Sequence, residues 1–308
     1  MRVRAPTWDD VPEVIALVQA ADVAVLGETH ETREALESDW REVDLANDAW
    51  VIEVDGRIGA YALFEDRGGG RLIVEGHVHP ELRGRGLGSR LIDVTERHAR
   101  ASVARQPPGV RVYLQNAALV GDECTPKLFA RRRYEPAQYQ FRMLAELDEP
   151  PVDPTVPGVD IRLMRDPDDR RPVHAVLEDA FAFGRDAFRR REYDEWAAEV
   201  FGREHFDPTL TWVASEGDAI VGASVCGWKE AGDWGWVGTL GVLPSHRGRG
   251  IGAALLHTAF AEFWRRGERR VALGVAADNP SATGLYERAG MRVLYTIVLY
   301  EKELRAAA

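Results

Sequence analysis

The chain contains two copies of one glycine-rich hexapeptide, and these are the residues whose types and spacing most clearly suit chemistry. The copies are Arg83, Gly84, Arg85, Gly86, Leu87, Gly88 and Arg247, Gly248, Arg249, Gly250, Ile251, Gly252. Each follows an apolar run that ends in proline and precedes a helical pattern, which predicts a strand, a turn and a helix N-terminus. Free N–H groups and the helix dipole suit such a turn to a phosphate or pyrophosphate.

Three other interpretations of the turn can be compared with the sequence. A tight turn that merely needs glycine explains one isolated copy, but two copies in the same context favour a ligand. The dinucleotide fingerprint fits Gly248, Gly250 and Ala253, with Glu268 at about the required 20 positions beyond. Glu268 precedes the next strand, however, and the first copy has Ser89 in third place. A P-loop is excluded because no Gly-Lys-Ser/Thr follows.

The pattern RxxGxG after a strand ending in proline resembles the acyl-coenzyme A pyrophosphate loop of the GNAT family of N-acetyltransferases. Both copies fit it. Downstream, Asn279 to Met291 is similar to the motif around the family's fourth helix, with asparagine at the start and Leu285-Tyr286-Glu287 in the middle. The resemblance covers both halves of the chain and is fuller in the second.

This resemblance implies an α/β (α+β layered) fold of two tandem domains, each a mixed, mostly antiparallel sheet flanked by helices. It implies acetyl-CoA as cosubstrate, bound by the two loops, by Ala253 and Asn279, and by main-chain groups on a strand that splays from its neighbour. Those strand residues are Leu240, Gly241 and Val242. It implies Tyr286 as the general acid for the departing thiolate, because a phenol stays protonated at neutral pH.

The first half departs from the pattern at its last helix. Alignment of the two halves places Phe129 at the position of Tyr286 and Arg133 at the position of the motif's terminal glycine. Phenylalanine cannot donate a proton. We therefore expect the first domain to be catalytically degenerate, while its intact loop retains the features of a coenzyme site.

The general base is not identified by the sequence. Many family members carry a glutamate early in the fourth strand, and the corresponding positions here are Trp236 and Leu72. The remaining candidates, acting directly or through water, are Glu230, Asp233 and His246.

A polar stripe precedes the first loop. Glu75, His77 and His79 alternate along one strand, so they lie on one face of it. A packed or solvent-facing stripe explains them as well as a functional cluster does, and we assign them no metal.

Length and the repeat predict two domains. The two loops are 164 residues apart in a chain of 308, which allows two cores of about 150 residues each. The stretch 148–158 contains four prolines and is unsuited to a helix or a central strand. We expect domains at 1–147 and 159–308 with this segment as linker.

Composition excludes several classes of function. A net charge of −11 and a pI of about 5.3 argue against a nucleic-acid partner, which requires a basic face. Cys124 and Cys226 lie in different halves, which suggests a reducing compartment without disulfides. A charged N-terminus without a signal peptide, and no apolar run of about 20 residues, predict a cytoplasmic protein with no membrane partner.

These features predict an N-acetyltransferase that moves an acetyl group from acetyl-CoA to a primary amine of a small molecule, by direct attack in a ternary complex. Acidic and aromatic residues between 179 and 236 could form a pocket for a cationic amine, although such aromatics more often form core. The alternatives are a protein N-terminal or lysine acetyltransferase and a non-catalytic acyl-CoA sensor. The two-domain layout is similar to that of mycothiol synthases.

Overall fold

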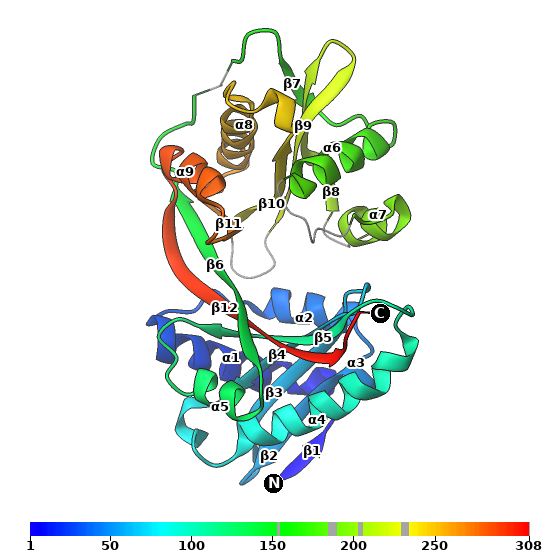
Figure 1. The fold of residues 1–308 in the computed structure, drawn as a ribbon. Coiled ribbons are helices and arrows are strands. Elements are labelled where there is room, and N and C mark those ends of the chain that lie inside the picture. Colours follow the sequence, from blue (N-terminus) through cyan, green and yellow to red (C-terminus); the bar gives the residue numbers. More distant parts are fainter. Residues whose placement is uncertain (153–154, 184–189, 203–205, 229–233, 308) are drawn as a thin grey trace. The chain divides into compact units, whose positions relative to one another are not determined.

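Two units make up the chain in the computed structural model, which describes residues 1–152, 155–183, 190–202, 206–228 and 234–307 (Figure 1). Unit 1 comprises Met1–Phe141 and Tyr295–Ala308, and unit 2 comprises Arg142–Leu294. Each combines a β-sheet with helices, and the predicted fold class is confirmed.

Unit 1 has the strand order β1-β2-β3-β4-β5-β12. Its strands are β1 (Arg2–Arg4), β2 (Ala49–Val54), β3 (Arg57–Asp66), β4 (Arg71–Val78), β5 (Val112–Leu119), the first part of β6 (Glu135–Glu146) and most of β12 (Arg292–Arg305). Its helices are α1 (Val11–Leu26), α2 (Arg33–Glu42), α3 (Leu45–Asp48), α4 (Leu87–Ser102) and α5 (Thr125–Arg131). Only the β4–β5 pair among the registers described for this unit is parallel.

Two cores cover the two faces of the sheet of unit 1. Leu72, Val74 and Leu114 pack with the apolar side of α4 and with Phe129 of α5. On the other face, residues such as Tyr61 of β3 pack against α1 and α2. The alternation of side chains along each strand assigns successive residues to these two cores.

Unit 2 repeats the arrangement, with β11-β10-β9-β8-β7 as its strand order beyond the end of β6. Its strands are β7 (Asp160–Leu163), β8 (Phe206–Glu216), β9 (Ala219–Trp228), β10 (Gly235–Val242) and β11 (Arg270–Ala276). Its helices are α6 (Arg170–Ala182), α7 (Tyr193–Phe201), α8 (Ile251–Arg265) and α9 (Pro280–Arg288). The β10–β11 pair is parallel, as β4–β5 is in unit 1. No helix in the described part of the chain is long and apolar enough to cross a bilayer.

The C-terminal strand belongs largely to the sheet of unit 1. From Ile297 to Arg305, β12 runs antiparallel to β5, and Lys302 of β12 forms an ion pair of 2.7 Å with Glu96 of α4. The contacts therefore group residues 295–308 with unit 1 and residues 142–147 with unit 2, unlike the boundary expected from the sequence. Figure 1 draws the strands that connect the units, β6 in green and β12 in red.

An ion pair at the same place in both units ties the first strand to the first helix. Arg4 donates to Asp10 at 2.6 Å, and Arg162 donates to Asp169 at 2.6 Å. In unit 1 the Arg4 guanidinium lowers the pKa of Asp10 from 3.8 to about 2, because it stabilises the charged carboxylate.

We predict that Asp10→Asn lowers the free energy of unfolding by about 1 kcal/mol at pH 7. The ion pair of Asp10 contributes its full stabilisation at pH values above the unfolded-state pKa of this carboxyl. That stabilisation is lost as the pH falls through the folded-state pKa of about 2. Urea unfolding at pH 7 and at a pH of about 2 measures it, and most of the difference between the two proteins should be lost at the lower pH. Asp9→Asn, at an exposed neighbour, is the matched control; an equal loss there would contradict the role of the pair.

Candidate active site

The two glycine loops adopt one backbone conformation. In unit 2, Gly248 and Gly250 have φ of 76° and 85°, and in unit 1 Gly84 and Gly86 have φ of 78° and 82°. A Cβ at these positions would meet no atom within 4 Å. Glycine is thus required by the left-handed backbone and not by lack of space.

Each loop leads directly into the N-terminus of its helix. Gly250 is the N-cap of α8 and Gly86 that of α4, and neither cap supplies a side chain to the first N–H groups. These first-turn groups have no acceptor within their own helix. Both loops therefore present backbone donors at the positive end of a helix dipole, as expected for an anion site.

The first arginine of the second loop is directed inward. The Arg247 guanidinium donates to the carbonyl of Ala180 in α6 at 2.7 Å and to that of Val242 in β10 at 3.2 Å. It therefore joins the loop to a strand and a helix, a structural contribution that the motif alone does not reveal.

The second arginine of each loop is held by an acid of the preceding hairpin. Arg249 lies 2.9 Å from Glu216, and Arg85 lies 3.1 Å from Asp55. The Arg249 guanidinium lowers the pKa of Glu216, which also bonds His246 at 3.1 Å. These arginines are already paired, so the backbone donors are the clearest anion-binding groups of the loops.

Strands β10 and β11 pair only at their beginning. The parallel register runs from Gly235–Val271 to Val237–Leu273, and a bulge follows at Gly238. Beyond it, Thr239 to Val242 are paired with β9 alone in the register of β10. We call this gap the strand opening of unit 2; it is the splay that the family resemblance implies.

Strand alternation shows which backbone groups face the opening. The N–H of Leu243 donates to Val221 of β9. Alternate residues of an antiparallel strand direct both backbone groups to the same neighbour, so Gly241 also faces β9, while Leu240 and Val242 face the opening. The lack of a side chain at Gly241 admits α6, since a Cβ there would lie 2.9 Å from Leu177.

Tyr286 lies on α9 with 8% of its surface exposed. Burial raises the pKa of its phenol to about 12, and the nearby Cys226 adds to the shift. Cys226 is the register partner of Val237, the last residue of β10 that pairs with β11. The phenol is therefore protonated at neutral pH and lies close to Cys226, which adjoins the strand opening.

Asn279 is the N-cap of α9, and its Oδ1 accepts from the N–H of Ala282 at 3.2 Å. Its carboxamide oxygen has a structural partner, which leaves the amide nitrogen as the group with which this side chain could donate to a ligand.

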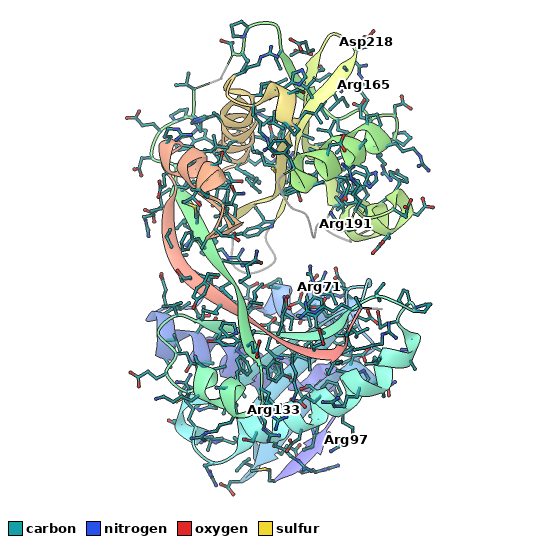
Figure 2. All side chains as sticks on the ribbon, viewed as in Figure 1. Arg71, Arg97, Arg133, Arg165, Arg191 and Asp218 are labelled. Carbon is teal, nitrogen blue, oxygen red and sulfur yellow. The ribbon has the colours of Figure 1, made fainter. Side chains whose placement is uncertain are left out.

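In unit 1, the turn after α5 has the same backbone conformation as the turn after α9, but Phe129 stands in place of Tyr286. Phe129 is buried against Tyr134 and Tyr300, with ring centroids 5.3 and 5.0 Å away. Arg133, labelled in Figure 2, has φ of 61° and so adopts the left-handed conformation that Gly290 has in unit 2. A non-glycine residue thus preserves the turn after α5.

Of the three candidates for the general base, the structure describes His246. Glu230 and Asp233 lie outside the described residues. His246 is on the loop, where it bonds Glu216 and Ser245. At the start of β10, the Trp236 ring lies 4.4 Å from the guanidinium carbon of Arg142. Nothing among these described groups identifies a base.

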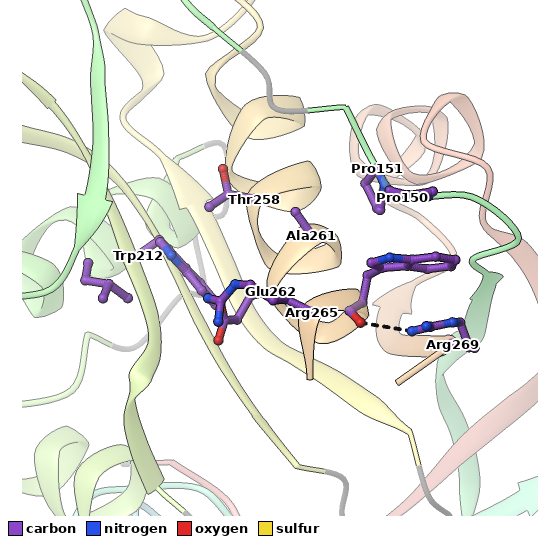
Figure 3. A pocket seen from close by; sticks show the side chains of 10 residues that line it. Pro150, Pro151, Trp212, Thr258, Ala261, Glu262, Arg265 and Arg269 are labelled. Atoms are coloured by element: carbon purple, nitrogen blue, oxygen red, sulfur yellow. Dashed lines mark hydrogen bonds and ion pairs between the residues drawn. The ribbon is translucent and has the colours of Figure 1, made fainter. Parts of the chain in front are cut away.

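A cavity beside α8 in unit 2 is separate from this site. It has a volume of about 770 Å³ and is lined by α8 residues such as Glu262, by the linker residues Pro150 and Pro151, and by Trp264 and Arg269 (Figure 3). It includes no loop glycine and not Tyr286.

Most of the described tryptophans between 179 and 236 form core. Trp196, Trp212 and Trp234 are at most 5% exposed. No group of three potential metal ligands is found among the described residues.

The model of the acetyltransferase (GNAT) family matches residues 15–116 and 173–291, and the chain belongs to this family. Mycothiol acetyltransferase of Geodermatophilus obscurus is 31% identical over 79% of this chain and 78% of the relative. The enzyme of that name from Thermobispora bispora is 30% identical, with 79% of each chain covered.

Solved structures agree on the tandem layout. A GCN5-related N-acetyltransferase from Sphaerobacter thermophilus has a TM-score of 0.89 at 32% identity, covering 100% of this chain and 96% of that one. A tandem GNAT protein from the clavulanic acid biosynthesis pathway has a TM-score of 0.73 at 16% identity, covering 100% of both, and shares the fold. The chain is an acetyl-CoA-dependent N-acetyltransferase of two GNAT regions.

The two arginines of the second loop should differ in their effect on stability. We predict that Arg247→Lys lowers the free energy of unfolding by about 1 kcal/mol, because an ammonium cannot reproduce the two directed bonds of the guanidinium. Arg249→Lys is the control and should cost much less, since its partner Glu216 is an exposed carboxylate. Chemical denaturation measures both; equal losses would contradict the structural role of Arg247.

Proposed function

We propose that unit 2 transfers the acetyl group of acetyl-CoA to a primary amine of a small molecule, by direct attack in a ternary complex. The observation that carries this proposal is the position of a buried, protonated phenol, Tyr286, near the place where β10 and β11 separate. A glycine loop and a helix N-terminus lie at the other end of the same strand.

Each part of the coenzyme has a binding region in this arrangement. Its pyrophosphate binds the N–H groups of Arg247 to Ala253 at the start of α8. Its pantetheine arm lies in the strand opening and pairs with the backbone of Leu240 and Val242, with Asn279 donating from its amide nitrogen. Backbone groups that would otherwise lack a strand partner are satisfied in this way.

Acetyl transfer then requires the amine nitrogen to lose a proton and the departing sulfur to gain one. The amine nitrogen attacks the thioester carbon and loses a proton to water or to a base. The C–S bond breaks, and the Tyr286 phenol gives its proton to the departing sulfur. A strand N–H in the opening stabilises the oxyanion that forms during attack.

Two observations support a small molecule as the acceptor of the acetyl group. The relatives at about 30% identity over more than three quarters of the chain are named for mycothiol, a thiol compound and not a protein. Trp236 lies at the start of β10 among the β10–β11 pairs, with the guanidinium of Arg142 from β6 against its ring, and both would contact an acceptor there.

We predict that Gly250→Asp abolishes coenzyme binding to unit 2. Aspartate is strained at φ of 85° and places an anion beside the phosphate site. Calorimetry with acetyl-CoA measures the stoichiometry, and Gly86→Asp is the matched variant in unit 1. Unchanged binding in the Gly250→Asp protein would refute the assignment of the loop.

We predict that Tyr286→Phe lowers kcat by about 10²-fold, the low end for general acid catalysis, because a thiolate is a fair leaving group. Affinity for acetyl-CoA should change little, since the ring remains. The measurement is made in a Gly86→Asp background, so that only unit 2 carries coenzyme. Tyr113→Phe in β5, where the ring stacks on Arg111, is the control. Unchanged turnover with chemistry rate-limiting would make Tyr286 a packing residue.

A further inference from the structure

Unit 1 contains a strand opening of its own. The parallel register of β4 and β5 ends at Val74–Asn116, and the N–H of His79 donates to Gly59 of the neighbouring hairpin. By the alternation of strand groups, Gly76 and Val78 direct their backbone toward the gap. These are the same positions, relative to the glycine loop, as Leu240 and Val242 in unit 2.

Two buried polar atoms lie beside the last strand pair on the α4 side. The Nδ2 of Asn116 and the phenolic oxygen of Tyr134 have no hydrogen-bond partner of ordinary geometry in the described part of the chain. The two residues are only 6% and 3% exposed. Leaving such groups unsatisfied costs about 1–3 kcal/mol each, which is the mark of a site that awaits a ligand.

Tyr134 brings a phenol to this side although residue 129 is phenylalanine. Its ring packs on Phe129. Burial raises the pKa of the phenol, with the Glu96 carboxylate adding to the shift, while Asn116 lies close enough to oppose it. The hydroxyl therefore lies near Asn116, at the end of the β4–β5 pairing, and holds its proton.

An ion pair lies beside these two atoms. The neighbouring ion pair between Lys302 and Glu96 closes at 2.7 Å without them. Tyr134 and Asn116 could be replaced by apolar residues of similar shape without breaking that pair.

The opposite face of the opening carries a carboxylate and an imidazole. Glu75 and His77 alternate on β4 and point to the α1/α2 side, where His77 is the register partner of Tyr61. His77 Nε2 lies 2.8 Å from Glu75, whose side chain is 56% exposed. At the corresponding positions unit 2 has Thr239 and Gly241, which cannot take a proton.

A second carboxylate lies close to His77 on this face. Asp22 of α1 accepts from the Thr29 hydroxyl at 3.1 Å. Burial raises the pKa of Asp22, and the charge of His77 opposes that shift, so the two groups are close. An amine that enters as a cation is favoured here by the surrounding carboxylates.

We propose that unit 1 is a second acetyl-transfer site, specific for a cationic amine, in which Glu75 accepts the amine proton and Tyr134 protonates the leaving sulfur. The nitrogen attacks the thioester carbon, the C–N bond forms and the C–S bond breaks. The products are an amide and the free thiol of coenzyme A, so atoms and electrons balance without a further reactant. The proposal rests on the acetyl-CoA chemistry proposed for unit 2.

The test uses the full chain, because β12 completes the sheet of unit 1. Unit 2 is silenced by Gly250→Asp together with Tyr286→Phe, and thiol release from acetyl-CoA is followed over a panel of mono- and polyamines. We expect one bound coenzyme, lost on adding Gly86→Asp, and residual turnover. Glu75→Gln or Tyr134→Phe should then lower kcat at least 10-fold, with Tyr113→Phe unchanged.

Stability separates a catalytic from a packing role for Tyr134. Because its hydroxyl has no ordinary partner, Tyr134→Phe should leave the melting temperature unchanged or raise it. A silenced protein that binds coenzyme but releases no thiol with any amine overturns the second site, and unit 1 is then degenerate as the sequence predicts. Failure of the proposed function is distinct, since it appears as unchanged turnover of Tyr286→Phe in the Gly86→Asp background.

Discussion

The separation of two parallel strands is the constraint on which the rest of the structure depends. At the bulge of Gly238, β10 leaves β11, and the backbone of Leu240 and Val242 loses its neighbour. Unpaired strand groups inside a fold are unfavourable unless something else pairs with them. An extended chain of amides such as pantetheine is well matched to that need, and in the proposed function the glycine loop at the end of the same strand binds its phosphates.

The second constraint is that the loops must hold their shape without a ligand. Arg247 bonds two carbonyl groups, and Arg249 and Arg85 are paired with hairpin acids. Positive charge within the motif is thus used to fix the loop. Phosphate recognition is left to N–H groups and the helix dipole, which also suits a chain of net charge −11.

Local patterns predicted well what depends on local structure. The two loops and the helix start at Asn279 follow from short-range spacing, and the fold class follows from the repetition of the loops. The placement of β12 beside β5 could not be predicted, because β6 and β12 are both long, strand-forming segments and only long-range pairing distinguishes them. The inward turn of Arg247 and the direction of Gly241 toward β9 likewise depend on α6 and β9, which lie far away in the sequence.

The sequence predicts one catalytic and one degenerate copy, and the second site proposed above gives a different comparison of the two halves. In unit 2 the phenol is present, but Thr239 and Gly241 leave the other face of the opening neutral, and Arg142 adds a cation beside Trp236. That opening is best suited to a neutral amine that has already given its proton to water.

In unit 1 the carboxylates of Glu75 and Asp22 favour a protonated amine, which must lose its proton within the site. In the two proposed sites, the electrostatics of the openings therefore favour acceptors in different protonation states. One fold used twice in a chain can in this way distinguish two substrates without any change in how it holds the coenzyme.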